Sequence, residues 1–148
     1  MNPTSPAPAT LAPLWFRLFA AVYDLFPVLA LWFVATTIAL LARGGALDVH
    51  RWTDKLLVQA LIVAFTGVYF VVSWRRGGQT IGMKPWRLRI VRADGGAIDA
   101  NQALIRCAVA FVSLLALGIG FLWALFDPQK RTWHDIAAKT LMVRVAKA

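Results

Sequence analysis

The chain has 148 residues, of which 59% are hydrophobic and only 16% are charged. An ordinary globular domain has roughly 25% charged residues, so this composition argues against a soluble domain, a disordered chain and a soluble enzyme. The 16 Lys and Arg residues outnumber the 7 acidic residues, all of them Asp, and give a formal net charge of +9. The single cysteine, Cys107, excludes an internal disulfide and a cysteine-based metal cluster.

The first predicted element is a long membrane helix at about residues 14–42. Before it, segment 1–13 contains four prolines and no charged residue, which predicts a flexible Pro/Ala-rich tail. This tail lacks the basic residues that open a secretory signal peptide, so we do not expect one. From Leu25 to Ala42 the chain is uncharged over 18 residues, close to the roughly 20 that cross about 30 Å of hydrocarbon.

Two further uncharged apolar runs, Leu56–Trp74 and Cys107–Phe126, predict membrane helices at about 56–74 and 102–126. The basic segment between them, 75–101, is interpreted as lying at the membrane interface. Around Leu88–Val91 apolar and basic residues alternate, and this period of two is typical of a short strand. The predicted fold class is therefore an all-α membrane protein, with three transmembrane helices and a short basic interfacial segment in one membrane domain, 14–146. A small β-hairpin or strand pair is an additional option.

The course of the third apolar run decides the orientation of the chain. If the run crosses the membrane, each side carries eight basic residues, and the positive-inside rule gives no orientation. If it turns back near Gly118–Gly120, the split becomes 13 to 3. The run's length favours a plain span, and the charge favours the return. A return would also allow Leu141–Val145, which alternates as a strand does, to pair with Leu88–Val91.

Three basic side chains of the interfacial segment, Lys84, Arg87 and Arg89, are predicted to contact lipid headgroups. Basic residues beside a membrane helix each add about 1 kcal/mol of attraction to an anionic leaflet. Gly77 and Gly82 have the spacing of a phosphate-binding loop, but Met83 stands where such a loop has lysine. We therefore expect no nucleotide site. The basic charge is spread around apolar runs, which argues against nucleic acid as a partner.

Asp24 is the candidate site residue inside the first predicted helix. An ionised carboxylate within the bilayer costs at least ~2.5 kcal/mol, so it must face protein or water, or be protonated. Arg17 lies seven residues earlier on the same helix face, about 10 Å away along the axis, which is too far for a direct pair. Two interpretations stand side by side: a proton or cation site, or a structural carboxylate held by a basic residue of another segment.

The order of these polar residues resembles the RDD family of small multi-pass membrane proteins, named for one Arg and two Asp. The resemblance covers about residues 12–146, and its most specific parts are the Gly78–Lys84 segment and the closing His134–Asp135 with Ala138 and Thr140. It maps the family's arginine to Arg17, the first aspartate to Asp24 and the second best to Asp135. Asp94 and Asp127 are the alternatives for the second aspartate.

The resemblance implies a multi-pass protein of the cell membrane with no settled molecular function. The first expectation is transport of a proton, cation or small ligand through Arg17, Asp24 and Asp135. One protomer has too few helices for a typical transport site, so an oligomer would share it. The alternative is a non-catalytic adaptor or assembly subunit that binds another membrane protein. The expected partners are lipids and a second copy or another membrane protein. No enzymatic activity, cofactor or metal is expected.

Overall fold

The computed structural model describes residues 9–146, and the first eight residues of the predicted tail lie outside this range. Within the tail, Ala9–Leu11 forms the short strand β1. Its neighbour Ala12 donates its backbone N–H to the carbonyl of Met142, 2.9 Å away. The last part of the predicted tail is therefore anchored to the far end of the chain, a pairing that proline content does not reveal.

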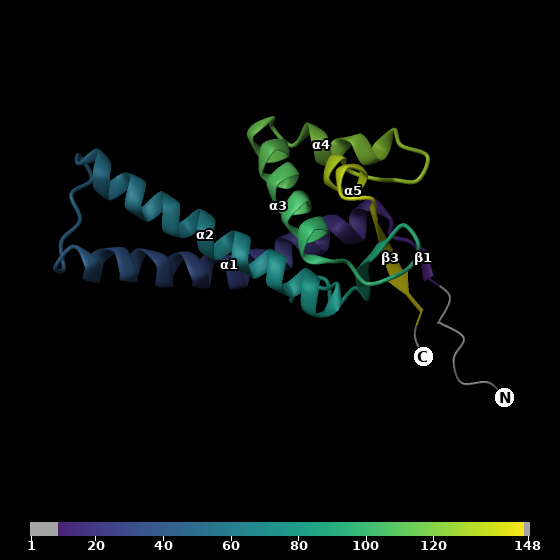
Figure 1. Cartoon of the computed structure of the whole chain (residues 1–148), viewed down its shortest axis with the longest axis horizontal. Coiled ribbons are helices and arrows are strands. Elements are labelled where there is room, and N and C mark those ends of the chain that lie inside the picture. Colours follow the sequence, from purple (N-terminus) through teal and green to yellow (C-terminus); the bar gives the residue numbers. More distant parts are fainter. Residues whose placement is uncertain (1–8, 147–148) are drawn as a thin grey trace.

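Two long helices, α1 (Leu14–Ala42) and α2 (Trp52–Gly77), form an antiparallel hairpin that extends away from the rest of the molecule (Figure 1). The predicted bounds of α1 are confirmed, whereas α2 extends beyond 56–74 at both ends. Asp54 lies in its first turn and two arginines in its last, each favourable for the helix dipole. Gly78, in the left-handed conformation at φ +66°, ends α2.

The third apolar run is broken, so the prediction of one continuous helix over 102–126 is wrong. It forms α3 (Ala100–Leu115), α4 (Ile119–Leu122) and a 3-10 turn, η1 (Trp123–Leu125), with a bend of 111° between α3 and the Ile119–Leu125 segment. At the break Leu117 and Gly118 are both left-handed. Gly118 N–H bonds the Ser113 carbonyl and Leu117 N–H bonds that of Leu114, the hydrogen-bond pattern of a Schellman helix end.

The number of helices that could cross a membrane is accordingly two to three. Helices α1 and α2 are long and apolar enough by themselves, and a third span requires the bent pair to count as one. In Figure 1, α3 runs across the direction of the hairpin, and α4 turns back over α5 (Trp133–Ala137). The structure thus supports the mostly helical membrane fold without fixing the count at three.

A three-stranded antiparallel sheet closes the end of the hairpin where α1 begins. Strand β3 (Thr140–Val145) lies in the centre, between β1 and β2 (Leu88–Arg92). Val91 pairs with Leu141 and Leu88 with Arg144, which confirms the predicted strand pair and brings the C-terminal segment beside β2. The chain segments before α1, after α2 and after α4 therefore meet at one end of the hairpin; we call this end, with the sheet and α5, the cap.

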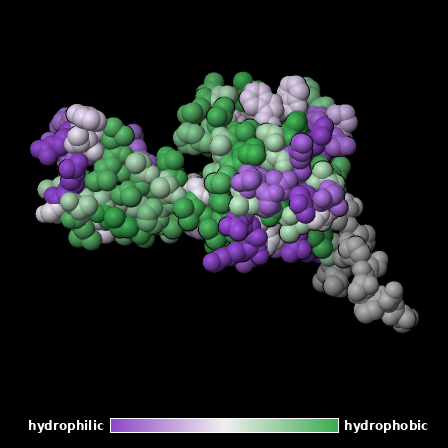
Figure 2. Space-filling view, viewed as in Figure 1, coloured by the Kyte–Doolittle hydropathy of each residue, from purple (hydrophilic) through white to green (hydrophobic). Residues whose placement is uncertain are grey.

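The surface divides along the length of the molecule. Hydrophobic residues cover the outer part of the hairpin and much of α3, while hydrophilic residues gather at the α1–α2 loop and around the cap (Figure 2). Phe26 and Phe33 of α1 are 73% and 76% exposed. The buried hydrophobic core, in contrast, lies where the cap packs on the hairpin, around Ala20, Trp74 and Leu88. Apolar side chains along the hairpin are thus available to lipid or to another membrane protein.

Candidate functional site

Asp135, in α5, is fully buried between two arginines from different helices. Its Oδ2 lies 3.0 Å from Nη1 of Arg17 in α1, and its Oδ1 lies 2.5 Å from Nη1 of Arg106 in α3. Arg17 also donates to the carbonyl of Ala12 at 3.2 Å. Arg17 and Asp135 belong to the same set of polar residues that carries the family resemblance. They are 118 positions apart in the sequence, and the fold brings them into direct contact.

Local backbone structure sets the orientation of Asp135. Thr132 caps the short helix α5, and its N–H and Oγ1–H both donate to Asp135 Oδ2, at 3.1 and 2.9 Å. Burial by itself opposes ionisation of this carboxyl, but the positive charges of the guanidinium groups, Arg106 first and Arg17 after it, outweigh burial and lower its pKa. Asp135 is therefore a carboxylate whose two oxygens both accept hydrogen bonds from the chain itself.

The Asp135 cluster carries an excess positive charge, because two guanidinium groups share one carboxylate. Arg106 Nη1 also donates to the hydroxyl of Thr140. Arg106 is completely buried, and over residues 9–146 its Nε and Nη2 find no hydrogen-bond partner. Its Cζ lies 5.2 Å from the ring centroid of Trp74, so a cation–π contact compensates part of its desolvation.

Asp24 occupies a second site, lower in charge, about two turns further along α1 than Arg17. Its Oδ1 accepts from the Tyr69 hydroxyl at 2.6 Å and the Gly82 N–H at 2.8 Å, and its Oδ2 accepts from the Thr80 hydroxyl at 2.5 Å. Asp24 is 5% exposed and faces the protein, as expected. It makes no ion pair with any described residue, so hydroxyl and amide donors take the place of the basic partner expected from the sequence.

Close backbone contacts explain why glycine stands at both ends of the segment from Gly78 to Gly82, which binds Asp24. A Cβ on Gly78 would lie 2.6 Å from the Ile90 carbonyl oxygen, and a Cβ on Gly82 would overlap the carbonyl oxygen of Ala20. Both positions therefore require glycine, since only glycine lets the backbone approach so closely. Thr80, between them, supplies the hydroxyl. The motif is thus a loop shaped to bind a carboxylate of the chain's own first helix.

Substituting Gly82 with alanine is expected to destabilise the protein by about 1–3 kcal/mol, because the new methyl group forces the loop away from α1. The measurement is thermal unfolding of the detergent-solubilised variant. Gly77→Ala is the matched control, since a Cβ there meets nothing within 4 Å. Equal melting temperatures for the two variants would contradict the close contact between the loop and α1.

His134 is the one buried histidine among the described residues, and its ring packs 5.1 Å from that of Phe121. Its Nε2 lies 2.8 Å from Thr132 Oγ1. Because that hydroxyl already donates to Asp135, it must accept the hydrogen of Nε2. Burial, followed by the charge of Arg106, lowers the pKa of His134 to about 3. The imidazole is therefore neutral in the folded protein throughout the physiological pH range.

This lowered pKa predicts a loss of stability in mild acid. The unfolded chain protonates His134 below about pH 6.5 and the folded chain only near pH 3, so falling pH favours unfolding by about 1.4 kcal/mol per unit between these values. We expect His134→Gln to flatten this slope in unfolding experiments at about pH 7 and about pH 4.5. His50→Gln, in the α1–α2 loop, should leave the slope unchanged; the same slope in both variants would refute the assignment.

The three basic residues predicted to contact headgroups are not brought together. Arg87 lines a shallow groove with Thr10 and Arg144, whereas Arg89 lines a separate cavity beside the end of α2. Lys84 is exposed and lines neither. The predicted set is thus a dispersed basic surface around the cap rather than one site.

Sequence reasoning missed Arg106, Tyr69 and Thr80 as site residues. Arg106 carried a usable signal: it is a basic residue inside the predicted helix 102–126, where the cost of burying charge calls for a partner. Thr80 also carried a signal, since it lies inside the Gly78–Lys84 segment that supports the family resemblance. Tyr69 carried none, because an isolated hydroxyl group in an apolar helix is common. The alternatives for the second aspartate pair elsewhere: Asp94 with Arg92 at 3.4 Å and Asp127 with Arg131 at 3.0 Å.

Apolar helices of membrane-crossing length, with buried arginine and aspartate residues at their base, define an integral membrane protein. More particularly, the chain belongs to the RDD family, whose sequence profile matches residues 11–139. The match includes Arg17, Asp24 and Asp135, and so covers both carboxylate sites. No curated protein and no solved structure matches the chain.

Proposed function

We propose that this RDD protein is a non-catalytic membrane adaptor or assembly subunit, and that its arginine and aspartate residues hold the hairpin and the cap in one arrangement. One observation carries the proposal: all four oxygens of Asp24 and Asp135 already accept hydrogen bonds from groups of the chain. A transported cation at either site would have to displace these donors. Carboxylates satisfied in this way fit a structural role better than an ion-binding one.

The adaptor role follows from the part of the hairpin surface that the contacts of Asp135 and Asp24 leave uncovered. Asp135 joins α1, α3 and α5, and Asp24 joins α1, α2 and the Gly78–Gly82 segment. The cap is thereby fixed at one end of the hairpin, and the outer part of the hairpin extends beyond it (Figure 1). Its exposed aromatic side chains, such as Phe26 and Phe33, offer an apolar surface to a partner within the bilayer.

The proposed location is the cell membrane, with both described ends of the chain in the cytoplasm. With α1 and α2 as the two spans and the bent pair returning, 13 basic residues lie on the side of the cap and 3 on the side of the loop. The positive-inside rule then places the cap in the cytoplasm.

Cysteine labelling tests this topology. In a Cys107→Ala background, Lys84→Cys and Lys139→Cys are expected to react with an impermeant maleimide only after the membrane is opened, whereas Arg51→Cys reacts in intact cells. All three positions are exposed. Labelling of positions 84 and 139 from opposite sides would show that the bent pair crosses the membrane, and would remove the 13-to-3 argument.

Transport within an oligomer is the second candidate, favoured by the burial of an acidic residue on a candidate span. Ion flux through proteoliposomes of the purified protein separates the two. The adaptor role predicts no flux of protons, sodium or potassium above that of empty vesicles. It also predicts that a photo-crosslinker at Phe33 joins the chain to one defined membrane protein. Flux that is lost in Asp24→Asn, with crosslinks only between copies of this chain, would establish transport instead.

A further inference from the structure

A cavity of about 210 Å³ lies beside the end of α2, and neither Asp24 nor Asp135 lines it. Its walls are Trp74–Gly78 of α2, Arg89–Val91 of β2 and the turn Gly95–Ile98. A single water molecule needs only about 10–15 Å³, so the space admits a larger polar group. The space beside two of the lining glycines is open, since a Cβ on Gly77 or Gly95 would meet nothing within 4 Å.

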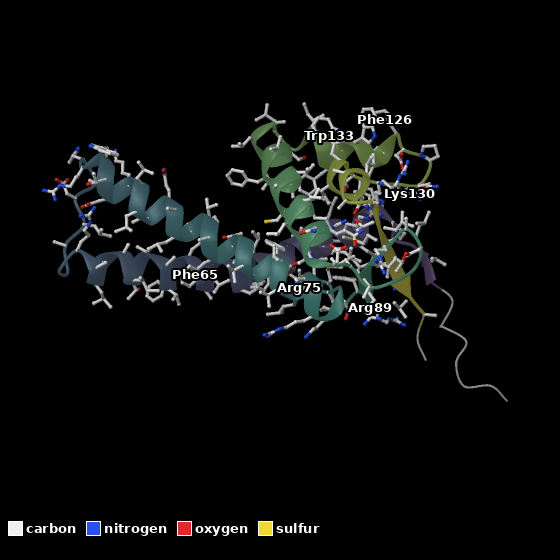
Figure 3. The ribbon with its side chains drawn as sticks, viewed as in Figure 1. Phe65, Arg75, Arg89, Phe126, Lys130 and Trp133 are labelled. Carbon is white, nitrogen blue, oxygen red and sulfur yellow. The ribbon has the colours of Figure 1, made fainter. Side chains whose placement is uncertain are left out.

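The charged side chains of the cavity are all basic. Arg75, Arg76 and Arg89 line it, and no acidic residue does. None of the three takes part in an ion pair within the part of the chain that the structure describes. Arg89 donates its Nε to the Gly77 carbonyl at 3.1 Å, and this contact fixes its guanidinium group at the cavity wall. Figure 3 shows Arg75 and Arg89 along the same edge of the molecule.

A neutral donor lies in the same wall. Trp74 is 8% exposed, and its Nε1 is buried with no hydrogen-bond partner among residues 9–146. Its ring is fixed between Phe70, 5.3 Å away, and the Arg106 guanidinium. A buried indole N–H normally has an acceptor, so this unpaired donor beside the cavity is a cost that the described contacts leave uncompensated.

We propose that this cavity binds a phosphate group, and that the phosphate belongs to the headgroup of an anionic lipid. Guanidinium groups match the geometry of phosphate oxygens and bind them through paired hydrogen bonds. The negative end of the α2 dipole disfavours an anion here, but the two arginines of its last turn oppose that field. The choice of a lipid rests on the proposed topology, which puts the end of α2 at the anionic cytoplasmic leaflet.

The test uses the purified full chain in a neutral detergent. Calorimetric titrations compare short-chain phosphatidylglycerol, short-chain phosphatidylcholine and inorganic phosphate. We expect phosphatidylglycerol to bind at least about tenfold more tightly than phosphatidylcholine, and to lose at least about tenfold in the triple variant Arg75→Gln, Arg76→Gln, Arg89→Gln. Gly77→Leu, which fills the cavity without changing the charge, should weaken binding as well.

A matched control removes three positive charges outside the cavity, in the variant Lys55→Gln, Lys130→Gln, Lys139→Gln. It should bind phosphatidylglycerol as the wild type does. Equal loss in both triple variants would show diffuse attraction to the basic surface, and equal binding of the two lipids would show that the anionic headgroup is not recognised; either result would overturn the site. Inorganic phosphate bound as tightly as phosphatidylglycerol, with the same variants affected, would retain the phosphate site and overturn the lipid as its source. The substituted arginines are exposed, and unchanged melting temperatures verify that each variant folds.

Discussion

Replacing Asp135 with asparagine is expected to lower the free energy of unfolding by about 3–5 kcal/mol. The substitution preserves shape but removes the one negative charge that Arg17 and Arg106 share. Both arginines are buried, so each would retain the cost of desolvation without its ion pair. The measurement is chemical or thermal unfolding in detergent, with accumulation in the membrane as a second readout.

Asp94→Asn is the matched control for this substitution. Asp94 also pairs with an arginine, Arg92, but its side chain is 67% exposed. Exposed ion pairs contribute about 0–1 kcal/mol, so the control should unfold almost as the wild type does. A loss below about 1 kcal/mol in Asp135→Asn would mean that water reaches the cluster. The structural role proposed for Asp135 would then fail.

The two long helices follow from patterns that are visible in the sequence, whereas the return of the C-terminal segment was one of two alternatives. The thickness of the bilayer sets the length that a membrane helix needs. The apolar runs therefore predicted α1 closely, and they predicted α2 except for its polar ends. The return was left open by the sequence, because the unequal distribution of basic residues favoured it while the length of the run favoured a plain span. The strand pairing of Leu88–Val91 with the C-terminal residues was a consequence of that return.

The break in the third run could not be predicted with the same rules. Leu117 adopts a left-handed conformation at φ +55°, which a leucine rarely does, and the sequence marks only Gly118 as permissive. Tertiary contacts supply the rest: a Cβ on Gly120 would lie 2.8 Å from that of Ser113 and 2.9 Å from the Trp133 ring. The bend is thus determined by how closely α4 returns over α3 and α5, which is long-range information.

The partners of the candidate site were likewise beyond sequence reasoning, although its acidic residues were not. A charge in an apolar segment is conspicuous, and this pointed to Arg17 and Asp24, whereas Asp135 followed from the resemblance to the RDD family. Nothing in the sequence distinguishes the hydroxyl of Tyr69 or the N–H of Gly82 from other donors, and only the fold places them beside Asp24. Sequence therefore indicated where buried charge needs compensation, and the structure identified which groups provide it.

Substitutions of Asp24 are expected to have opposite consequences under the structural and the transport interpretations. Asp24→Ala leaves three donors without an acceptor, those of Tyr69, Thr80 and Gly82. At about 1 kcal/mol or more for each unsatisfied buried donor, the loss of stability should be about 3 kcal/mol or more. The measurement is unfolding in detergent, compared with Tyr69→Phe, which removes one donor and should cost much less.

Asp24→Asn is the discriminating variant, because asparagine can keep the geometry. Its oxygen can accept from Tyr69 and Gly82 as Oδ1 does, and its amide N–H can donate to the Thr80 hydroxyl in place of Oδ2. Only the Thr80 proton then loses its acceptor, a cost of about 1 kcal/mol. If Asp24 serves as a structural acceptor, the asparagine protein should therefore fold and bind its partner nearly as the wild type does. A site that binds protons or cations needs the titratable charge itself, so a stable Asp24→Asn protein that has lost its activity would rule out the structural interpretation.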